Sequence, residues 1–313
     1  MSATTGTVGD RPELPPGLLR RYISQMSATK GCTVMGSPQD RTIQIGKVKA
    51  RYWDEGNQGE PVVLIHGLGG YVENWLPSFD ALAAQHRVVA VDLPGHGRTE
   101  KPTDVAYGVE DLAGFVKDFI AALQIERAHV VGHSMGGAVA TRLVLMHPAT
   151  VDRLALVAPA GFGKEFHPMV RLSSAPLLGE LLTRPSRSGS ADFARTAVHD
   201  PAVITDELIE LDYQMALQPG AQAASLRTLR GLCSPFGQKK SLYGVHVSRL
   251  ASITNPVLVI WGRQDRVIPA AHAEVAAKGL PNVRVQLLDN CGHMPMLEQA
   301  DTFNASLLEF LSR

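Results

Sequence analysis

The sequence predicts an α/β protein with a mostly parallel, twisted sheet flanked by helices, and three observations support this prediction. Short apolar runs and amphipathic helical patterns alternate along most of the chain, as in parallel strands joined by helical crossovers. The alternation stops between residues 162 and 248, where helical fragments are separated by Pro, Gly and Ser, and then resumes. A Gly-x-Ser-x-Gly pentapeptide at 132–136 lies between a strand-like run and an apolar helix. We therefore expect a sheet with a helical segment inserted between two of its strands.

Length and composition indicate a globular protein with a substantial core. The 313 residues are 45% hydrophobic, and 30 Lys and Arg balance 30 Asp and Glu. This balance predicts a small, weakly charged substrate and no nucleic acid or membrane partner. The three widely spaced cysteines argue against a disulfide framework or a zinc site and favour a reducing compartment. The first ten residues lack an apolar signal core, and no apolar stretch reaches membrane-spanning length, so we expect a cytoplasmic protein.

Residues 1–40 form the expected N-terminal arm, which contains one short amphipathic helix. Pro15 and Pro16 are typical of a helix start. Apolar residues then recur at helical spacing, namely Leu18, Leu19, Tyr22, Ile23 and Met26. Such a stripe must be covered, so we expect it to pack on its own domain, on the substrate entrance or on a second subunit. A homodimer is therefore one of the expectations.

Residues 41–161 and 249–313 form the expected α/β core, and 162–248 form a helical lid over the carboxyl edge of the sheet, where open α/β sheets bind ligands. Alternation around Gly46 predicts an antiparallel hairpin. Continuous apolar runs predict buried strands at 61–66, 88–91, 130–131, 154–157, 256–261 and 283–288. Apolar periodicity predicts core helices at 75–84, 112–123, 137–146, 270–279 and 301–311, and lid helices at 175–182, 191–198, 204–217 and 221–232.

The pentapeptide predicts a nucleophile elbow, in which a strand turns sharply into a helix. Ser134 then occupies a strained backbone region and projects its hydroxyl above the sheet. A side chain at Gly132 or Gly136 would collide with the neighbouring strand or helix. The start of the following helix contributes free N–H groups and a positive dipole beside the serine.

Serine becomes a nucleophile only when a base removes its proton and a third group orients that base. Asp265 follows the buried strand at 256–261, and His293 lies in a glycine-flanked loop after the next strand. Both therefore reach the same edge of the sheet as Ser134, in the chain order serine, acid, histidine. Asp92 and Asp289 are rival acids, but the first precedes the elbow and the second lies on or beside a strand.

An oxyanion also needs backbone donors. We expect the N–H of Met135, directly after the nucleophile, and the N–H of Leu68, in the glycine-rich loop after the first buried strand. His66, Gly67, His133 and Met294 are candidate substrate contacts because they neighbour these groups in the sequence. For the histidines a structural role is favoured, with His66 bracing the loop beside the site.

Five motifs together resemble the α/β-hydrolase superfamily: His66-Gly67-Leu68-Gly69, Asp92-Leu93-Pro94-Gly95-His96-Gly97, Gly132-His133-Ser134-Met135-Gly136, Gly262-Arg263-Gln264-Asp265 and Gly292-His293. The resemblance implies the α/β-hydrolase fold. Because the elbow residue is serine, it implies the serine-nucleophile branch, which includes carboxylesterases and the meta-cleavage-product hydrolases that cut C–C bonds. The stretch 291–298 is similar to the latter group.

Two departures from that group favour an ester substrate. Its members usually carry Trp after the catalytic histidine and Arg in the lid, where this chain has Met294 and Asp212. An aspartate would repel an anionic dienolate. We therefore expect a carboxylesterase for small to medium apolar esters that needs no cofactor or metal. The alternatives are a C–C hydrolase of 2-hydroxy-6-oxodienoates, a non-catalytic ligand-binding homologue, and a cofactor-free perhydrolase that would use the same residues.

Overall fold

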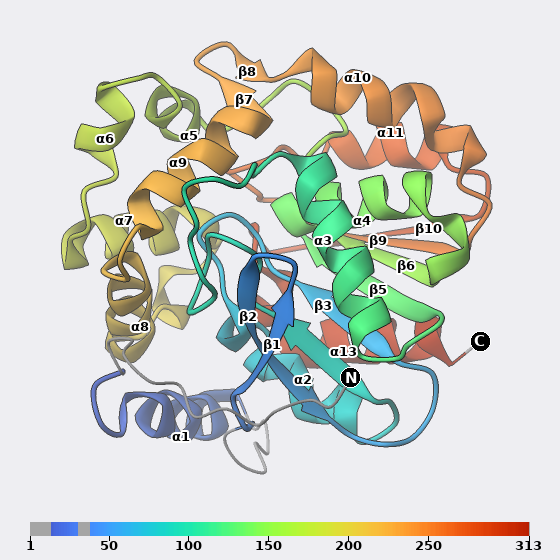
Figure 1. The fold of residues 1–313 in the computed structure, drawn as a ribbon, viewed down its shortest axis with the longest axis horizontal. Coiled ribbons are helices and arrows are strands. Elements are labelled where there is room, and N and C mark those ends of the chain that lie inside the picture. Colours follow the sequence, from blue (N-terminus) through green and yellow to red (C-terminus); the bar gives the residue numbers. More distant parts are fainter. Residues whose placement is uncertain (1–13, 31–37, 313) are drawn as a thin grey trace.

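A computed structural model describes residues 14–30 and 38–312 of the chain. Within these residues lies one eight-stranded sheet in the order β1-β2-β4-β3-β5-β6-β9-β10 (Figure 1). Its strands are β1 (Arg41–Ile45), β2 (Val48–Glu55), β3 (Val62–Ile65), β4 (Val88–Val91), β5 (Ala128–His133), β6 (Val151–Val157), β9 (Val257–Gly262) and β10 (Val283–Leu288). This is the mostly parallel sheet that the sequence predicts.

The strand register places the predicted site residues along one edge of the sheet. β1 and β2 form the predicted antiparallel hairpin, β2 pairs antiparallel with β4, and the remaining pairs are parallel. Ile65 pairs with Gly132, and Val157 pairs with Ile260. The carboxyl ends of β3, β5, β6 and β9 therefore meet at the same edge.

Each face of the sheet packs on its own hydrophobic core. Val63 and Ile65 of β3 face the core that includes α3 and α4, whereas Val62 and Leu64 face the core that includes α2 and α13. This alternation explains why β3 is apolar at every position. Apart from the N-terminal helix, the helices outside the insertion are η1 (Val72–Trp75), α2 (Leu76–Ala83), α3 (Val109–Ala122), α4 (Met135–Met146), η2 (Pro148–Thr150), α11 (His272–Gly279), α12 (Pro295–Glu298) and α13 (Ala300–Leu311).

Between β6 and β9 the chain forms a helical insertion; Figure 1 shows α5 to α9 along the left side of the molecule and α10 at the top, beside α11. The helix predicted at 175–182 covers only 178–182 in the structure, and the pattern predicts neither the helix at 168–173 nor the helix at 240–249, whose apolar spacing is irregular. The elements are α5 (Pro168–Ser173), α6 (Leu178–Leu182), α7 (Arg187–Ala197), η3 (Pro201–Val203), α8 (Asp206–Ala216), α9 (Ala221–Leu232), β7 (Cys233–Ser234), β8 (Gly237–Gln238), α10 (Lys240–Arg249) and η4 (Leu250–Ser252).

The N-terminal helix α1 (Leu18–Lys30) packs against α8 of the insertion. Leu18 and Tyr22 are buried in the core that also includes α8, and Leu19 and Ile23 pack against it. The side chain of Met26 and the whole of Cys32 lie outside the described residues. The helix thus packs on the chain's own insertion, through α8. Among the described helices none is both long and apolar enough to cross a membrane.

Candidate active site

The chain turns sharply at Ser134, between β5 and α4. The backbone of Ser134 has φ of 54° and ψ of −115°, a conformation that a residue with a side chain rarely adopts. A Cβ at Gly132 would lie 2.3 Å from the carbonyl oxygen of Gly136, and a Cβ at Gly136 would lie 2.2 Å from that of Ile65. Both glycines are therefore required by the close approach of strand and helix, as in a nucleophile elbow.

The loop after β3 lies against this turn. A Cβ at Gly67 would lie 3.1 Å from the Cβ of Ser134 and 3.1 Å from Nδ1 of His133. Leu68 follows directly, so its N–H group belongs to a loop in contact with the serine. Met135 begins α4, where helical geometry leaves the first N–H groups without an intrahelical acceptor. Leu68 and Met135 thus belong to the two segments next to Ser134.

Asp265 and His293 meet although they follow different strands. Nδ1 of His293 lies 2.7 Å from Oδ2 of Asp265. The second carboxylate oxygen, Oδ1, accepts hydrogen bonds from the N–H groups of Val267 at 2.7 Å and Ile268 at 2.9 Å, and Trp261 Nε1 donates to Oδ2 at 2.9 Å. These three donors hold the carboxylate in place, and it in turn orients the imidazole.

The rival acids lie elsewhere. Asp92 is fully buried, and its oxygens accept from the N–H groups of Val72 and Arg98. Asp289 is exposed and pairs with Arg263 at 2.7 Å. Neither carboxylate contacts His293, so Asp265 is the acid that the fold brings to the histidine.

His133 fixes the backbone of His293. Its Nε2 lies 2.8 Å from the carbonyl oxygen of His293, and the two ring centroids are 4.8 Å apart. Burial lowers the pKa of His133 well below its usual value, and the nearby His293 lowers it further. His133 is therefore neutral and donates from Nε2, so it adds no positive charge beside His293. The N–H of His293 also donates to Ala197 O at 2.7 Å, which ties the loop to the insertion.

His66 braces two loops. Its Nε2 accepts from the N–H of Leu93 at 3.0 Å, and its Nδ1 lies 2.7 Å from the carbonyl oxygen of Gly67. Burial lowers the pKa of His66, so the ring is neutral with its proton on Nδ1. These contacts join the loop after β3 to the loop after β4, as the structural interpretation of this histidine expects.

Ser134 and His293 are both largely covered, with 8% and 5% of their surfaces exposed. Within the described part of the chain, no hydrogen bond joins Ser134 Oγ to His293. Such bonds are often long until substrate binds. Met294, the residue after the histidine, is half-buried and packs against both cores.

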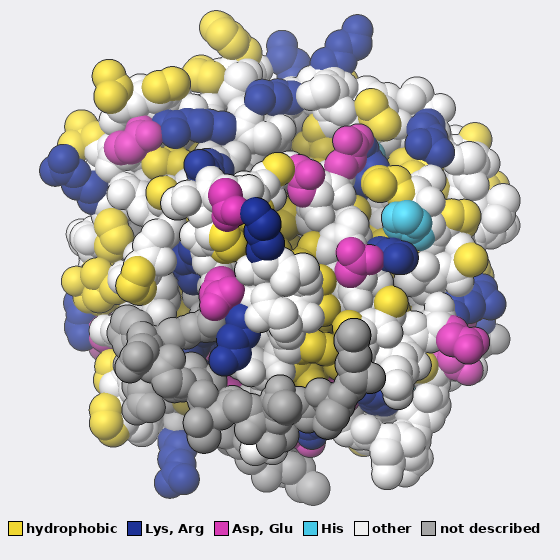
Figure 2. All heavy atoms as spheres, viewed as in Figure 1, with side chains coloured by type: hydrophobic (Ala, Val, Ile, Leu, Met, Phe, Trp, Pro, Cys, Tyr) yellow, Lys and Arg dark blue, Asp and Glu magenta, His cyan; other side chains and the backbone are white. Residues whose placement is uncertain are grey.

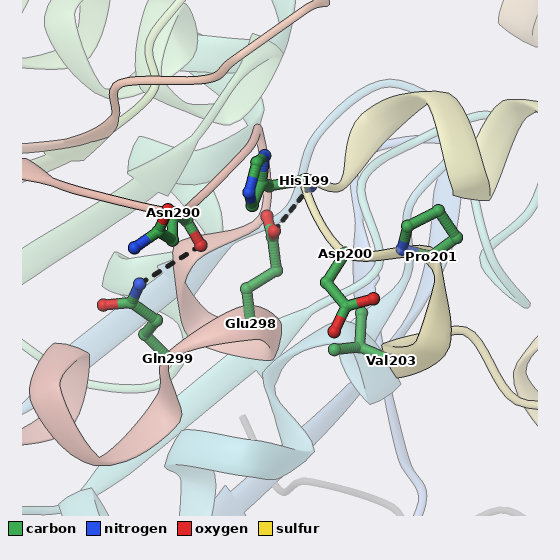
Figure 3. A pocket seen from close by; sticks show the side chains of 7 residues that line it. All are labelled: His199, Asp200, Pro201, Val203, Asn290, Glu298 and Gln299. Atoms are coloured by element: carbon green, nitrogen blue, oxygen red, sulfur yellow. Dashed lines mark hydrogen bonds between the residues drawn. The ribbon is translucent and has the colours of Figure 1, made fainter.

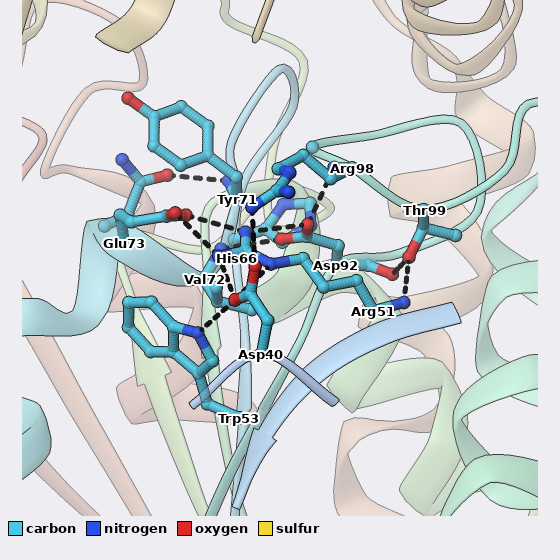
Figure 4. Close-up of polar contacts among 12 residues, drawn as sticks. Asp40, Arg51, Trp53, His66, Tyr71, Val72, Glu73, Asp92, Arg98 and Thr99 are labelled. Carbon is cyan, nitrogen blue, oxygen red and sulfur yellow. Dashed lines mark hydrogen bonds and ion pairs between the residues drawn. The ribbon is translucent and has the colours of Figure 1, made fainter. Parts of the chain in front are cut away.

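A buried ion network supports the loop that follows Gly67 (Figure 4). Arg51 of β2 binds both oxygens of Glu73, at 2.7 and 2.9 Å, and one oxygen of Asp92 at 3.2 Å. Asp40 also accepts from Arg51. Arg51, Glu73 and Asp92 are nearly inaccessible to solvent, so each charge depends on its partners, and removing one would leave another uncompensated. The network therefore holds β2, η1 and the end of β4 in one arrangement.

Comparisons with known proteins agree with this geometry. The family model described as the alpha/beta hydrolase fold matches residues 60–300. The chain belongs to the α/β-hydrolase fold family. In the described residues of this α/β-hydrolase, no cluster of three or more His, Cys, Asp or Glu is arranged to hold a metal ion.

Two proteins of similar sequence have names that describe different activities. The chain is 36% identical to the dihydrolipoyllysine-residue acetyltransferase component of the acetoin cleaving system of Cupriavidus necator, over 84% of this chain and 67% of that protein. It is 29% identical to a 2-hydroxy-6-oxononadienedioate/2-hydroxy-6-oxononatrienedioate hydrolase of Cupriavidus pinatubonensis, over 89% of this chain and 96% of that protein.

Among solved structures, the meta-cleavage product hydrolase from Pseudomonas fluorescens superimposes with a TM-score of 0.76 at 27% identity, covering 87% of this chain and 97% of that one. A putative lipase from Acinetobacter baumannii has a TM-score of 0.79 at 24% identity and shows the fold alone.

The α/β-hydrolase has a further carboxylate, Glu298, that sequence reasoning assigned no role. Its Oε1 accepts from the N–H groups of Gly292 at 2.8 Å and Met294 at 3.3 Å, on either side of His293. Its Oε2 accepts from the N–H of His199 at 2.7 Å, at the end of α7. Figure 3 shows this carboxylate at a polar pocket of about 450 Å³ beside η3. Glu298 therefore links the histidine loop to the insertion through backbone groups, which no side-chain pattern reveals.

A second unassigned contact joins the insertion to the loop before η1. Tyr71 Oη donates to Oδ1 of Asp212 of α8 at 2.5 Å. Burial raises the pKa of Asp212 to about 6, against the effect of the Tyr71 hydrogen bond. Burial raises the pKa of Tyr22 on α1, and the nearby Asp212 raises the pKa of Tyr22 further. Asp212, one of the two residues that set this chain apart in sequence from the meta-cleavage-product hydrolases, is thus hydrogen-bonded to a tyrosine.

Replacing Glu298 tests its role in holding the histidine loop. The amide nitrogen of Gln cannot accept a hydrogen bond, so Glu298→Gln leaves at least one of the three N–H groups without its acceptor. We expect the free energy of unfolding to fall by about 1–3 kcal/mol, measured by urea denaturation. Glu274→Gln, an exposed carboxylate on α11, is the matched control and should change little. Equal effects of the two substitutions would contradict this role.

Replacing Asp212 tests its contact through pH dependence. The folded-state pKa of about 6 exceeds the ordinary value of 3.8, so the folded protein binds this proton more tightly than the unfolded chain does. This group's contribution to stability is therefore complete at low pH and is lost as pH rises between about 4 and 6. We expect Asp212→Asn to gain stability relative to the wild type over that interval, measured by urea denaturation at each pH. A pH-independent difference would show that Asp212 is not buried as described.

Proposed function

We propose that this α/β-hydrolase is a carboxylic ester hydrolase that acts on small to medium apolar esters through Ser134, His293 and Asp265. The observation that carries the proposal is the 2.7 Å contact between His293 and Asp265, in a loop fixed against the residue next to the elbow serine. A buried carboxylate bonded to Nδ1 leaves Nε2 as the atom that exchanges a proton with the nucleophile.

The proposed mechanism proceeds through an acyl-enzyme. Nε2 of His293 takes the proton of Ser134 as its oxygen attacks the ester carbonyl, and the imidazolium is stabilised by Asp265. The N–H groups of Leu68 and Met135 stabilise the oxyanion. The alcohol leaves with the proton of His293, and water activated by the same base then releases the acid. Rigid donors are needed because losing one typically costs about 10²–10³ in rate.

Asp212 supports a neutral substrate. Above its pKa of about 6, this carboxylate is mainly ionised, and it binds Tyr71, three residues after the proposed donor Leu68. An anionic dienolate with its own carboxylate would be repelled near such a group. The tyrosine hydroxyl occupies one carboxylate oxygen without neutralising the charge, so an uncharged ester fits this arrangement better.

The alternative is hydrolysis of a C–C bond in a 2-hydroxy-6-oxodienoate. It is supported by the names of similar proteins, which include a 2-hydroxy-6-oxo-6-(2'-aminophenyl)hexa-2,4-dienoic acid hydrolase at 30% identity and the meta-cleavage product hydrolase structure. Such a reaction would use the same serine, histidine and aspartate. The substrates, rather than the machinery, distinguish the two proposals.

A panel of p-nitrophenyl esters of increasing acyl length, compared with a dienoate substrate, tests the proposal. We expect burst kinetics and a preference for short acyl chains, with ester turnover above dienoate turnover. Ser134→Ala should lower kcat by about 10³-fold or more, and Asp265→Asn by about 10³–10⁴-fold, because the histidine loses its orienting group.

Asp289→Asn is the matched control, because it removes the exposed rival carboxylate and should leave kcat unchanged. Retention of most activity in Ser134→Ala would show that Ser134 is not the nucleophile. Higher turnover of the dienoate than of the esters would contradict the proposed esterase activity and support C–C bond hydrolysis. Tight ligand binding with no burst of product would indicate a binding protein instead.

A further inference from the structure

Three neighbouring elements of the insertion direct large apolar side chains into solvent. Leu177, before α6, is 85% exposed, and Phe236, between β7 and β8, is 77% exposed. In Figure 2 apolar side chains gather over α5, α6 and the β7–β8 turn, along the upper left edge of the molecule. We call this surface the apolar face; its members are Met169, Leu172, Leu177, Leu178, Leu181, Leu182 and Phe236.

The apolar face is held in place by hydrogen bonds. Nε of Arg171 on α5 donates to the carbonyl oxygen of Pro235 in the β7–β8 turn at 2.9 Å, and Nε of Arg230 on α9 donates to that of Ser174 at 3.1 Å. Leu177 has φ of 66°, which is uncommon for a residue with a side chain. The exposed leucine therefore occupies a specified backbone conformation in a folded segment.

Positive charge surrounds the apolar face. The flanking segments carry Lys164, Arg171, Arg184, Lys239 and Lys240, and within the described part of the chain none of these five forms an ion pair. The same segments carry two acids: Glu180 pairs with Arg230 at 2.9 Å, and Glu165 lies 2.8 Å from His272, so the five cations outnumber the acids. A chain that is neutral overall thus has a cationic, apolar surface here.

We propose that the apolar face binds an anionic phospholipid bilayer, with its leucines and Phe236 inserted at the interface and the five cations against the headgroups. Apolar side chains rimmed by Lys and Arg are the combination that binds such surfaces. A second copy of the chain fits less well. In a two-fold symmetric contact the same patch meets itself, so these cations would oppose each other. The balanced total charge predicts no membrane partner, because total charge does not reveal how charge is distributed over the surface.

Vesicle sedimentation tests this surface with the full chain carrying Ser134→Ala, so that the lipid stays intact and the result does not depend on the proposed esterase. We expect binding to vesicles of phosphatidylglycerol and phosphatidylcholine, and much weaker binding to phosphatidylcholine alone or at high salt. Leu177→Ser with Phe236→Ser should weaken binding at least about tenfold. Lys239→Gln with Lys240→Gln should also weaken it at least about tenfold.

Phe193→Ser is the matched control, because Phe193 is a half-exposed aromatic on α7, outside the apolar face, and should leave binding unchanged. In the background that retains Ser134, the Leu177 and Phe236 substitutions should not change turnover of a soluble short ester, which confirms that the variants fold. No binding to the mixed vesicles, or equal binding to both compositions, would overturn the proposal. So would a dimer, detected by analytical ultracentrifugation without vesicle binding, that the Leu177 and Phe236 substitutions dissociate.

Discussion

The arrangement of the site depends on how His293 is held. Its imidazole is fixed at Nδ1 by Asp265, its carbonyl oxygen by His133 and its N–H by Ala197. A base in a loop after the last strand would otherwise have many backbone conformations, and only a few would direct Nε2 towards the elbow. Contacts from three separate segments therefore fix His293 together, and two of these contacts are made to its backbone atoms.

On the opposite side of the site, buried ion pairs hold the loop after β3 in place. Arg51, Glu73 and Asp92 are buried together, although a buried ion pair costs desolvation energy and is weak evidence for stability. Here the network has a positional consequence, because Asp92 also accepts from the N–H of Val72 and Glu73 belongs to η1. The loop that contains Leu68 is thereby confined between His66 and η1. Preorganised donors of this kind stabilise a developing oxyanion without rearranging during the reaction.

The sequence predicts the positions of the buried strands, the elbow and the meeting of Asp265 with His293, because these follow from apolar periodicity, glycine sterics and the shared edge of parallel strands. It does not predict the Glu298 contacts, since they are made to backbone N–H groups, or the Tyr71–Asp212 pair, whose members lie 141 positions apart. The fragments of the insertion were placed only roughly, because each is short and is stabilised by tertiary packing rather than by its own pattern. The local excess of cations was hidden by a total charge of zero.

The most direct test of the central claim is to label the protein with a fluorophosphonate and locate the modification by peptide mass spectrometry. A serine activated by the held histidine should be labelled stoichiometrically at Ser134. Labelling should be lost in His293→Ala and retained in His147→Ala, where the imidazole lies after the far end of α4. Modification of a different serine, or labelling of Ser134 that persists without His293, would contradict the assignment.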